Sequence, residues 1–230
     1  MTTFKANAPL AALCILAVGL AGCATKQPTA QTGPEAEVSF DGLYQYDNTR
    51  VDVAWAVPDL DLSSYTSIMP VNVGVAYREV PNRGNTTAAR SRGGPYFIDD
   101  DARSEFEALV DEIVAEELLK SNRFNIVSEP GPNTLKVSGG LLDVTSQVPP
   151  EPTGGRSRIY LSSVGEATLV LEIRDSESNR ILARAVDRRA AETISGSFMQ
   201  SNSVTNSAEV RRLIRHWGAL VREALEGFTR

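Results

Sequence analysis

The clearest structural pattern in the chain lies in the stretch GEATLVLEIRDSESNRILARAVDRR, which runs from Gly165 to Arg189. In its first half apolar and polar residues alternate, with apolar side chains at Ala167, Leu169, Leu171 and Ile173. The segment DSESN at 175–179 is typical of a turn, and the alternation resumes at Ile181. Because alternation places every second side chain on one face of a strand, the stretch predicts a β-hairpin with one buried face.

Two long segments on either side of this hairpin have helical periodicity. Between Asp100 and Ser121 apolar residues recur at helical spacing, and acidic residues at 99–101 favour the positively polarised start of a helix. Near the C-terminus a polar loop at 195–207 precedes an apolar stripe from Val210 to Phe228. Asn206, with Glu209 three residues later, is the expected N-cap of this second helix.

Shorter patterns complete the domain. Strands are expected at 51–57, 68–77, 124–128 and 134–145, and loops rich in Gly, Pro and Arg at 81–95 and 147–158. Pro70 has no N–H to donate and should lie at a strand start or a sheet edge, while Gly139-Gly140 indicates a bulge or a close backbone approach. We predict an α+β fold: an antiparallel-rich β-sheet with two long amphipathic helices packed on one face.

The N-terminus is typical of a bacterial lipoprotein precursor. Lys5 and the apolar run from Ala8 to Leu20 form a signal peptide too short to span a membrane. The residues that follow match a lipobox, with cleavage between Gly22 and Cys23 and lipidation, including palmitate, on Cys23. The lipobox residues are Leu20, Ala21, Gly22 and Cys23. We therefore expect a signal peptide at 1–22, a lipidated cysteine and flexible tether at 23–37, and one domain at 38–230.

Composition limits the chemistry of this domain. The chain has 23 basic and 29 acidic residues and a formal net charge of −6, which argues against nucleic-acid binding. Of the two cysteines, Cys14 lies in the signal peptide and Cys23 is the acylation site, so we expect neither disulfides nor a free thiol. The expected membrane partner is lipid, reached through the acyl chains on Cys23.

Four stretches taken together resemble a family of bacterial lipoproteins catalogued as domain of unknown function 3313. They are DLSSYTSIMPVNV (61–73), SEPGPNTLKVSGGLLDV (128–144), GEATLVLEIRDSESNRILARAVDRR (165–189) and the last helix with Trp217. The family carries no established activity, so the resemblance implies a fold and a place: the inner leaflet of the outer membrane, with the domain facing the periplasm. Ala24 after the cysteine is compatible with that place.

No set of residues predicts catalysis. His216 is the single histidine, and it borders the apolar stripe of the last helix. With one histidine and no free thiol, zinc sites and cysteine nucleophiles are not expected, and no serine lies in a nucleophile-elbow motif. We expect no cofactor and no enzymatic activity.

Clustered arginines give a candidate surface for an anion or a partner. Arg90 and Arg92 lie in the loop at 81–95, and Arg188 and Arg189 end the hairpin. Guanidinium groups bind carboxylates and phosphates well, but the many surface acids offer them salt bridges as an alternative.

The function that the sequence favours is a non-enzymatic binding or assembly module of the cell envelope. An envelope protein or peptidoglycan would be its partner. Two alternatives stay open: a hydrolase of envelope material that uses His216 or acidic residues, and a carrier with an apolar pocket between the sheet and the helices.

Overall fold

The computed structural model describes residues 27–150, 158–193 and 196–228. Its helices are α1 (Thr87–Ser91), α2 (Asp100–Leu119) and α3 (Ser203–Gly227). Its longer strands are β4 (Ser67–Tyr77), β6 (Thr134–Ser146), β8 (Ser163–Asp175) and β9 (Ile181–Glu192). Its shorter strands are β1 (Thr29–Ala30), β2 (Tyr44–Asp47), β3 (Val53–Ala56), β5 (Asn125–Ile126), β7 (Tyr160–Leu161) and β10 (Met199–Gln200).

One sheet of eight strands, in the order β1-β2-β3-β9-β8-β6-β4-β5, forms the body of the described chain. The predicted hairpin is confirmed as the antiparallel pair of β8 and β9, with Leu171 opposite Ala185. The α+β class is also confirmed, but the sheet is mixed, because β4 runs parallel to both β6 and β5. The crossover through α2 causes this, since the helix carries the chain back to the end of the sheet where β4 began.

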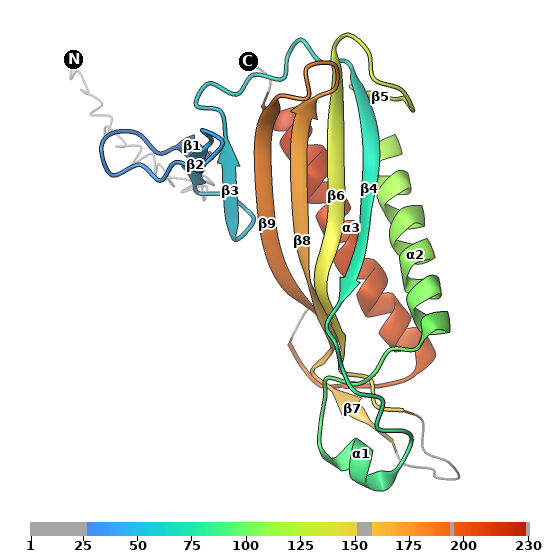
Figure 1. Ribbon diagram of the computed structural model, residues 1–230. Coiled ribbons are helices and arrows are strands. Elements are labelled where there is room, and N and C mark those ends of the chain that lie inside the picture. Colours follow the sequence, from blue (N-terminus) through green and yellow to red (C-terminus); the bar gives the residue numbers. More distant parts are fainter. Residues whose placement is uncertain (1–26, 151–157, 194–195, 229–230) are drawn as a thin grey trace, which may run out of the picture.

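Both long helices lie against the same face of the sheet (Figure 1). Apolar side chains of the strands and helices form two clusters, around Leu62, Ile68 and Leu225 at one end and around Ile113, Ile214 and Trp217 at the other. The opposite face carries ion pairs instead, among them Arg184 with Asp41 at 2.7 Å and Glu172 at 2.8 Å. The amphipathic pattern of the helices thus matches one buried face of the sheet.

Two local predictions need correction. The loop predicted at 195–207 ends earlier than expected, because α3 begins at Ser203. The N-cap of α3 is Asn202 and not Asn206. Thr205 donates its N–H to Asn202 Oδ1 at 3.0 Å, and its hydroxyl accepts from Asn202 N at 3.2 Å. A threonine therefore closes this capping box in place of the expected glutamate. The loop at 81–95 also contains a short helix, α1, capped by Thr86.

Pro70 lies in β4, and its position agrees with the expected sheet edge. On one side β4 pairs with β6, whereas on the other side β5 covers only Ser67 and Ile68. Ile68 O accepts from Val127 N on that outer side, at 2.9 Å. Successive residues of a strand face alternate sides, so the nitrogen of Pro70 faces the outer side too, beyond β5, where no ladder bond is lost.

Close packing of α2 against α3 depends on Gly218. A Cβ at this position would lie 2.8 Å from both Cβ and Cγ of Glu117, which is buried. Because the Cβ of Glu117 is fixed to the backbone, alanine at 218 must push the helices apart. We expect Gly218→Ala to lower the free energy of unfolding by about 1–3 kcal/mol in urea titrations.

Gly227→Ala is the matched control, since Gly227 ends the same helix and an added Cβ would meet nothing within 4 Å. It should leave stability unchanged or slightly raised. Equal unfolding free energies for the two variants would contradict the packing role of Gly218.

Candidate functional site

A cavity of about 400 Å³ lies between the sheet and the two long helices, and we call it the sheet–helix cavity. Strands β4, β6 and β8 form its floor, and α2 and α3 form its cover. Most of the side chains that line it are aliphatic, among them Val71, Val75, Val110, Val114, Leu118, Val137, Leu141, Leu169, Leu171 and Val221. Its size lies within the range of about 300–1,000 Å³ that is usual for small-molecule sites.

Gly139 makes room for the cavity. Leu135, Val137 and Leu141 alternate along β6 on the face that the helices cover, and position 139 belongs to that row. A Cβ at 139 would meet only Leu171 Cδ1, at 3.8 Å, which is ordinary contact. The missing side chain therefore leaves space in the middle of the sheet.

The neighbouring Gly140 has a different reason to be glycine. An added Cβ there would lie 2.3 Å from Val73 Cγ2 and 3.0 Å from Gly74 O. The close approach of backbone expected for this glycine pair is thus confirmed at Gly140, between β6 and β4. Gly139 needs no such approach, so its effect is the space that it leaves.

The exposed residues among those that line the cavity lie on β4 and α2, among them Asn72, Asp111 and Leu119, so the mouth of the cavity lies between the outer edge of β4 and α2. Asn72 Nδ2 donates to Asp111 Oδ1 at 2.6 Å and so ties the strand to the helix at one end of the mouth. Exposed apolar side chains lie at the other end, where Leu119 is 70% and Ile126 37% exposed. The rim is therefore apolar on one side and carries a carboxylate on the other.

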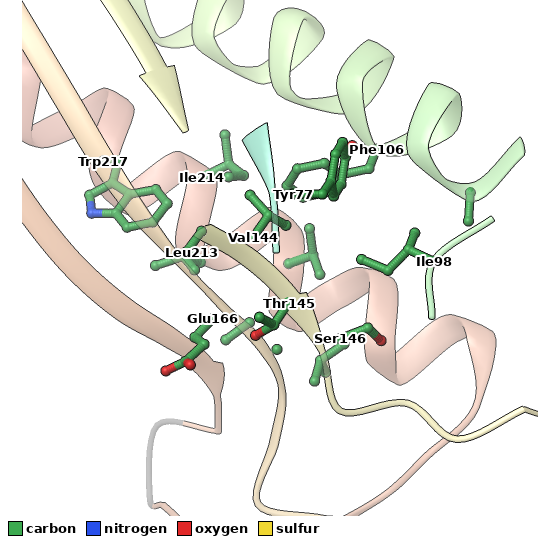
Figure 2. Close-up of a pocket in the computed structure, with 16 residues that line it drawn as sticks. Tyr77, Ile98, Phe106, Val144, Thr145, Ser146, Glu166, Leu213, Ile214 and Trp217 are labelled. Atoms are coloured by element: carbon green, nitrogen blue, oxygen red, sulfur yellow. The ribbon is translucent and has the colours of Figure 1, made fainter. Parts of the chain in front are cut away.

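A smaller cavity of about 180 Å³ adjoins the first toward the N-terminal halves of α2 and α3. Figure 2 shows its walls, with Tyr77, Phe106, Val144 and Leu213 around it. Ile214 and Trp217 line both cavities. Thr145 Oγ1 is buried in the wall of the smaller cavity and has no hydrogen-bond partner among the described residues. A water or a polar ligand group would satisfy it.

Trp217 is held by a buried carboxylate on the sheet. Its Nε1 donates to Asp187 Oδ2 at 2.7 Å, and the side chain of Asp187 is almost wholly buried. Asp187 also accepts from Asp52 N at 3.1 Å and from Arg189 Nε at 2.5 Å. Because donors from three residues converge on one carboxylate, the indole that lines both cavities has a fixed position.

The candidate arginines do not form one cluster of free groups. Arg188 pairs with Glu166 at 2.7 Å and with Asp143 at 3.3 Å, and Arg189 is engaged by Asp187. Arg90 binds within its own loop, to the Asn85 side chain at 2.6 Å, and Arg92 is the C-cap of α1. The use of these four residues as an anion or partner surface stays a prediction.

His216 lies on the exposed side of α3, beside Trp217. Partial burial and the nearby Arg189 lower its pKa. Among residues 27–150, 158–193 and 196–228, no hydroxyl group is hydrogen-bonded to its ring, and no cluster of His, Cys, Asp and Glu could hold a metal. A base for hydrolysis would need a nucleophile or a water positioned beside it.

The lipobox residues, including Gly22 and Cys23, lie outside the described residues, so cleavage and lipidation stay predictions. Within the described residues, no helix has the length and apolar character that crossing a membrane requires.

Comparisons with known proteins give a family and several distant structures. A family model described as "Protein of unknown function (DUF3313)" matches residues 38–221. Among curated proteins none matches significantly. A Xanthomonas campestris protein of family-model DUF330 is 11% identical, with a TM-score of 0.42, and the match covers 79% of this chain and 96% of that one.

Two further solved structures show a similarly low sequence identity and a low TM-score. The PelC dodecamer from Paraburkholderia phytofirmans is 11% identical, with a TM-score of 0.33 and coverage of 73% and 96% of the two chains. A hypothetical protein from Chlamydia trachomatis is 12% identical, with a TM-score of 0.35 and coverage of 70% and 99%. At these scores the similarities carry no inference about ligand or partner.

Proposed function

The chain belongs to the DUF3313 family of proteins of unknown function, and we propose that it is a non-enzymatic envelope protein that binds an apolar chain in the sheet–helix cavity. The cavity itself carries this proposal. Its walls are aliphatic, its volume suits a small ligand, and it opens to the surface through a rim with exposed Leu119 and Ile126. Burying a hydrocarbon chain there contributes about 0.8 kcal/mol per methylene.

We further propose that lipid on Cys23 anchors this binding module to the membrane through the segment between Cys23 and β1. This segment is shorter than the tether expected at 23–37, because Thr29 and Ala30 pair with β2. An anchored module would meet amphiphiles at the surface where they are concentrated. Two or more acyl chains give a stable attachment, whereas a single chain binds reversibly.

Photo-crosslinking in native membranes tests the ligand cavity. The full-length protein is exposed to a diazirine-bearing long-chain alcohol, illuminated and digested, and the modified peptides are found by mass spectrometry. Labelling should concentrate on the lining segments at 110–119 and 137–141. Labels confined to the outer face of the sheet, or no labels, would refute the proposal.

The anchor has its own test, with a matched pair of cysteine variants. Cys23→Ser should abolish incorporation of labelled palmitate and leave an unprocessed precursor, because the acylated thiol is gone. Cys14→Ser removes the other cysteine and should leave both processing and labelling intact. Palmitate on the Cys23→Ser protein would overturn the assignment.

A further inference from the structure

The rim of the sheet–helix cavity is acidic on its helix side. Glu107 and Asp111 lie one turn apart on the face of α2 that borders β4, and both are exposed. Glu107 accepts from the hydroxyl of Tyr77 at 3.1 Å, whereas Asp111 lines the cavity itself. In the part of the chain that the structure describes, no lysine or arginine lines this cavity. Glu107 has Arg103 near it, 4.9 Å from the Tyr77 ring centroid, but a ligand in the cavity itself meets the carboxylate of Asp111 with no cationic side chain among the described residues of the lining.

Asp111 is held in a defined position. Its Oδ1 accepts from Asn72 Nδ2, and Asn72 Oδ1 in turn accepts from Gly74 N at 2.7 Å. No hydrogen bond from the described residues reaches Asp111 Oδ2. One carboxylate oxygen at the mouth is therefore left to accept from a bound molecule.

We propose that the sheet–helix cavity selects a single-chain amphiphile with a cationic amine head group, with its chain among the aliphatic side chains and its ammonium on Asp111. This inference rests on the proposed ligand cavity. An ammonium group carries a positive charge and three N–H donors. The carboxylate of Asp111 attracts the charge, and its free oxygen accepts a hydrogen bond from the ammonium. A fatty acid would place a second carboxylate beside that of Asp111, and two adjacent negative charges repel each other.

Three diazirine probes of equal chain length, an alkyl amine, an alkyl alcohol and a fatty acid, test the selection on the full-length protein in native membranes. Labelling of the lining segments by the amine should exceed labelling by the fatty acid by about tenfold. A tenfold ratio in affinity is what one charge–charge interaction near a protein surface contributes in order of magnitude. The alcohol should fall between them.

Two variants distinguish the effect of Asp111 at the mouth from the effect of acidic residues elsewhere on α2. Asp111→Asn keeps an acceptor for Asn72 but removes the charge, so it should abolish most of the preference for the amine. Glu112→Gln removes the adjacent charge, which does not line the cavity and lies 3.9 Å from Arg211, so it should keep the preference.

The outcomes distinguish this inference from the proposed function. Labelling of the cavity by all three probes equally, or an equal amine preference in Asp111→Asn and in the unaltered protein, would overturn the head-group selection and leave the ligand cavity standing. Failure of the alcohol as well as the amine to label the cavity would overturn both.

Discussion

Leucine in place of Gly139 is expected to close the sheet–helix cavity to ligand and to stabilise the protein at the same time. The added side chain has four carbons and projects from the middle of β6 into the space that a ligand would fill. A bound hydrocarbon chain that can bury about four fewer methylenes loses about 3 kcal/mol of binding free energy. The dissociation constant should therefore rise more than about a hundredfold. Photo-crosslinking with the long-chain alcohol, titrated in native membranes, measures this loss.

The stability of the same variant should rise. Burying a leucine contributes about 1.5–3 kcal/mol, and removing a glycine from a strand adds about 0.5–1 kcal/mol. Ser138→Leu is the matched control, because it adds the same side chain one residue away, where alternation turns it to the opposite face of the sheet. It should leave labelling unchanged. A Gly139→Leu protein that is more stable and still labelled at full strength would show that the cavity is a packing defect and not a site.

The largest loss of stability is expected from Asp187→Ala. This change would leave Arg189, the indole N–H of Trp217 and the N–H of Asp52 without their shared acceptor. The buried indole N–H would lose a charged acceptor, and a hydrogen bond to a charged group contributes about 1.5–3 kcal/mol. Arg189, whose side chain is 38% exposed, would be hydrated, so the loss of its pairing adds about 1 kcal/mol at most. Urea unfolding, followed by the fluorescence of Trp217 and Trp55, measures the loss.

Glu223→Ala gives the comparison for this prediction. Glu223 pairs with Arg50 on the surface, where an ion pair is worth about 0–1 kcal/mol. Losses of similar size for the two variants would mean that Asp187 does not act as a buried anchor. If the Asp187→Ala protein kept its stability but no longer bound the long-chain alcohol, Asp187 would belong to the ligand site itself.

Local pattern was enough to predict most of the elements of this fold. The alternation from Ala167 to Ile173 predicted β8, and the helical spacing beyond Asp100 predicted α2 to within two residues of its end. The parallel pairing of β4 with β6 was not predicted, because register between distant strands depends on the path of the crossover. The start of α3 was missed because Thr205 performs the task that a glutamate more often performs in a capping box.

The cavity was foreseen only as one alternative and could not be located from sequence. It results from a missing side chain at Gly139, and a glycine in a strand has several possible reasons, as its neighbour Gly140 shows. Its walls come from strands and helices far apart in the chain, and the link between Asn72 and Asp111 spans 39 residues. Periodicity identifies which face of an element is buried but not how completely that face is filled.

Native mass spectrometry of the full-length protein, released from its own membranes, tests the ligand cavity most directly. We expect an additional non-covalent mass of one amphiphile on the unaltered protein and on Ser138→Leu, and no such mass on Gly139→Leu. The same bound mass on all three proteins, or on none of them, would contradict a ligand site in the sheet–helix cavity.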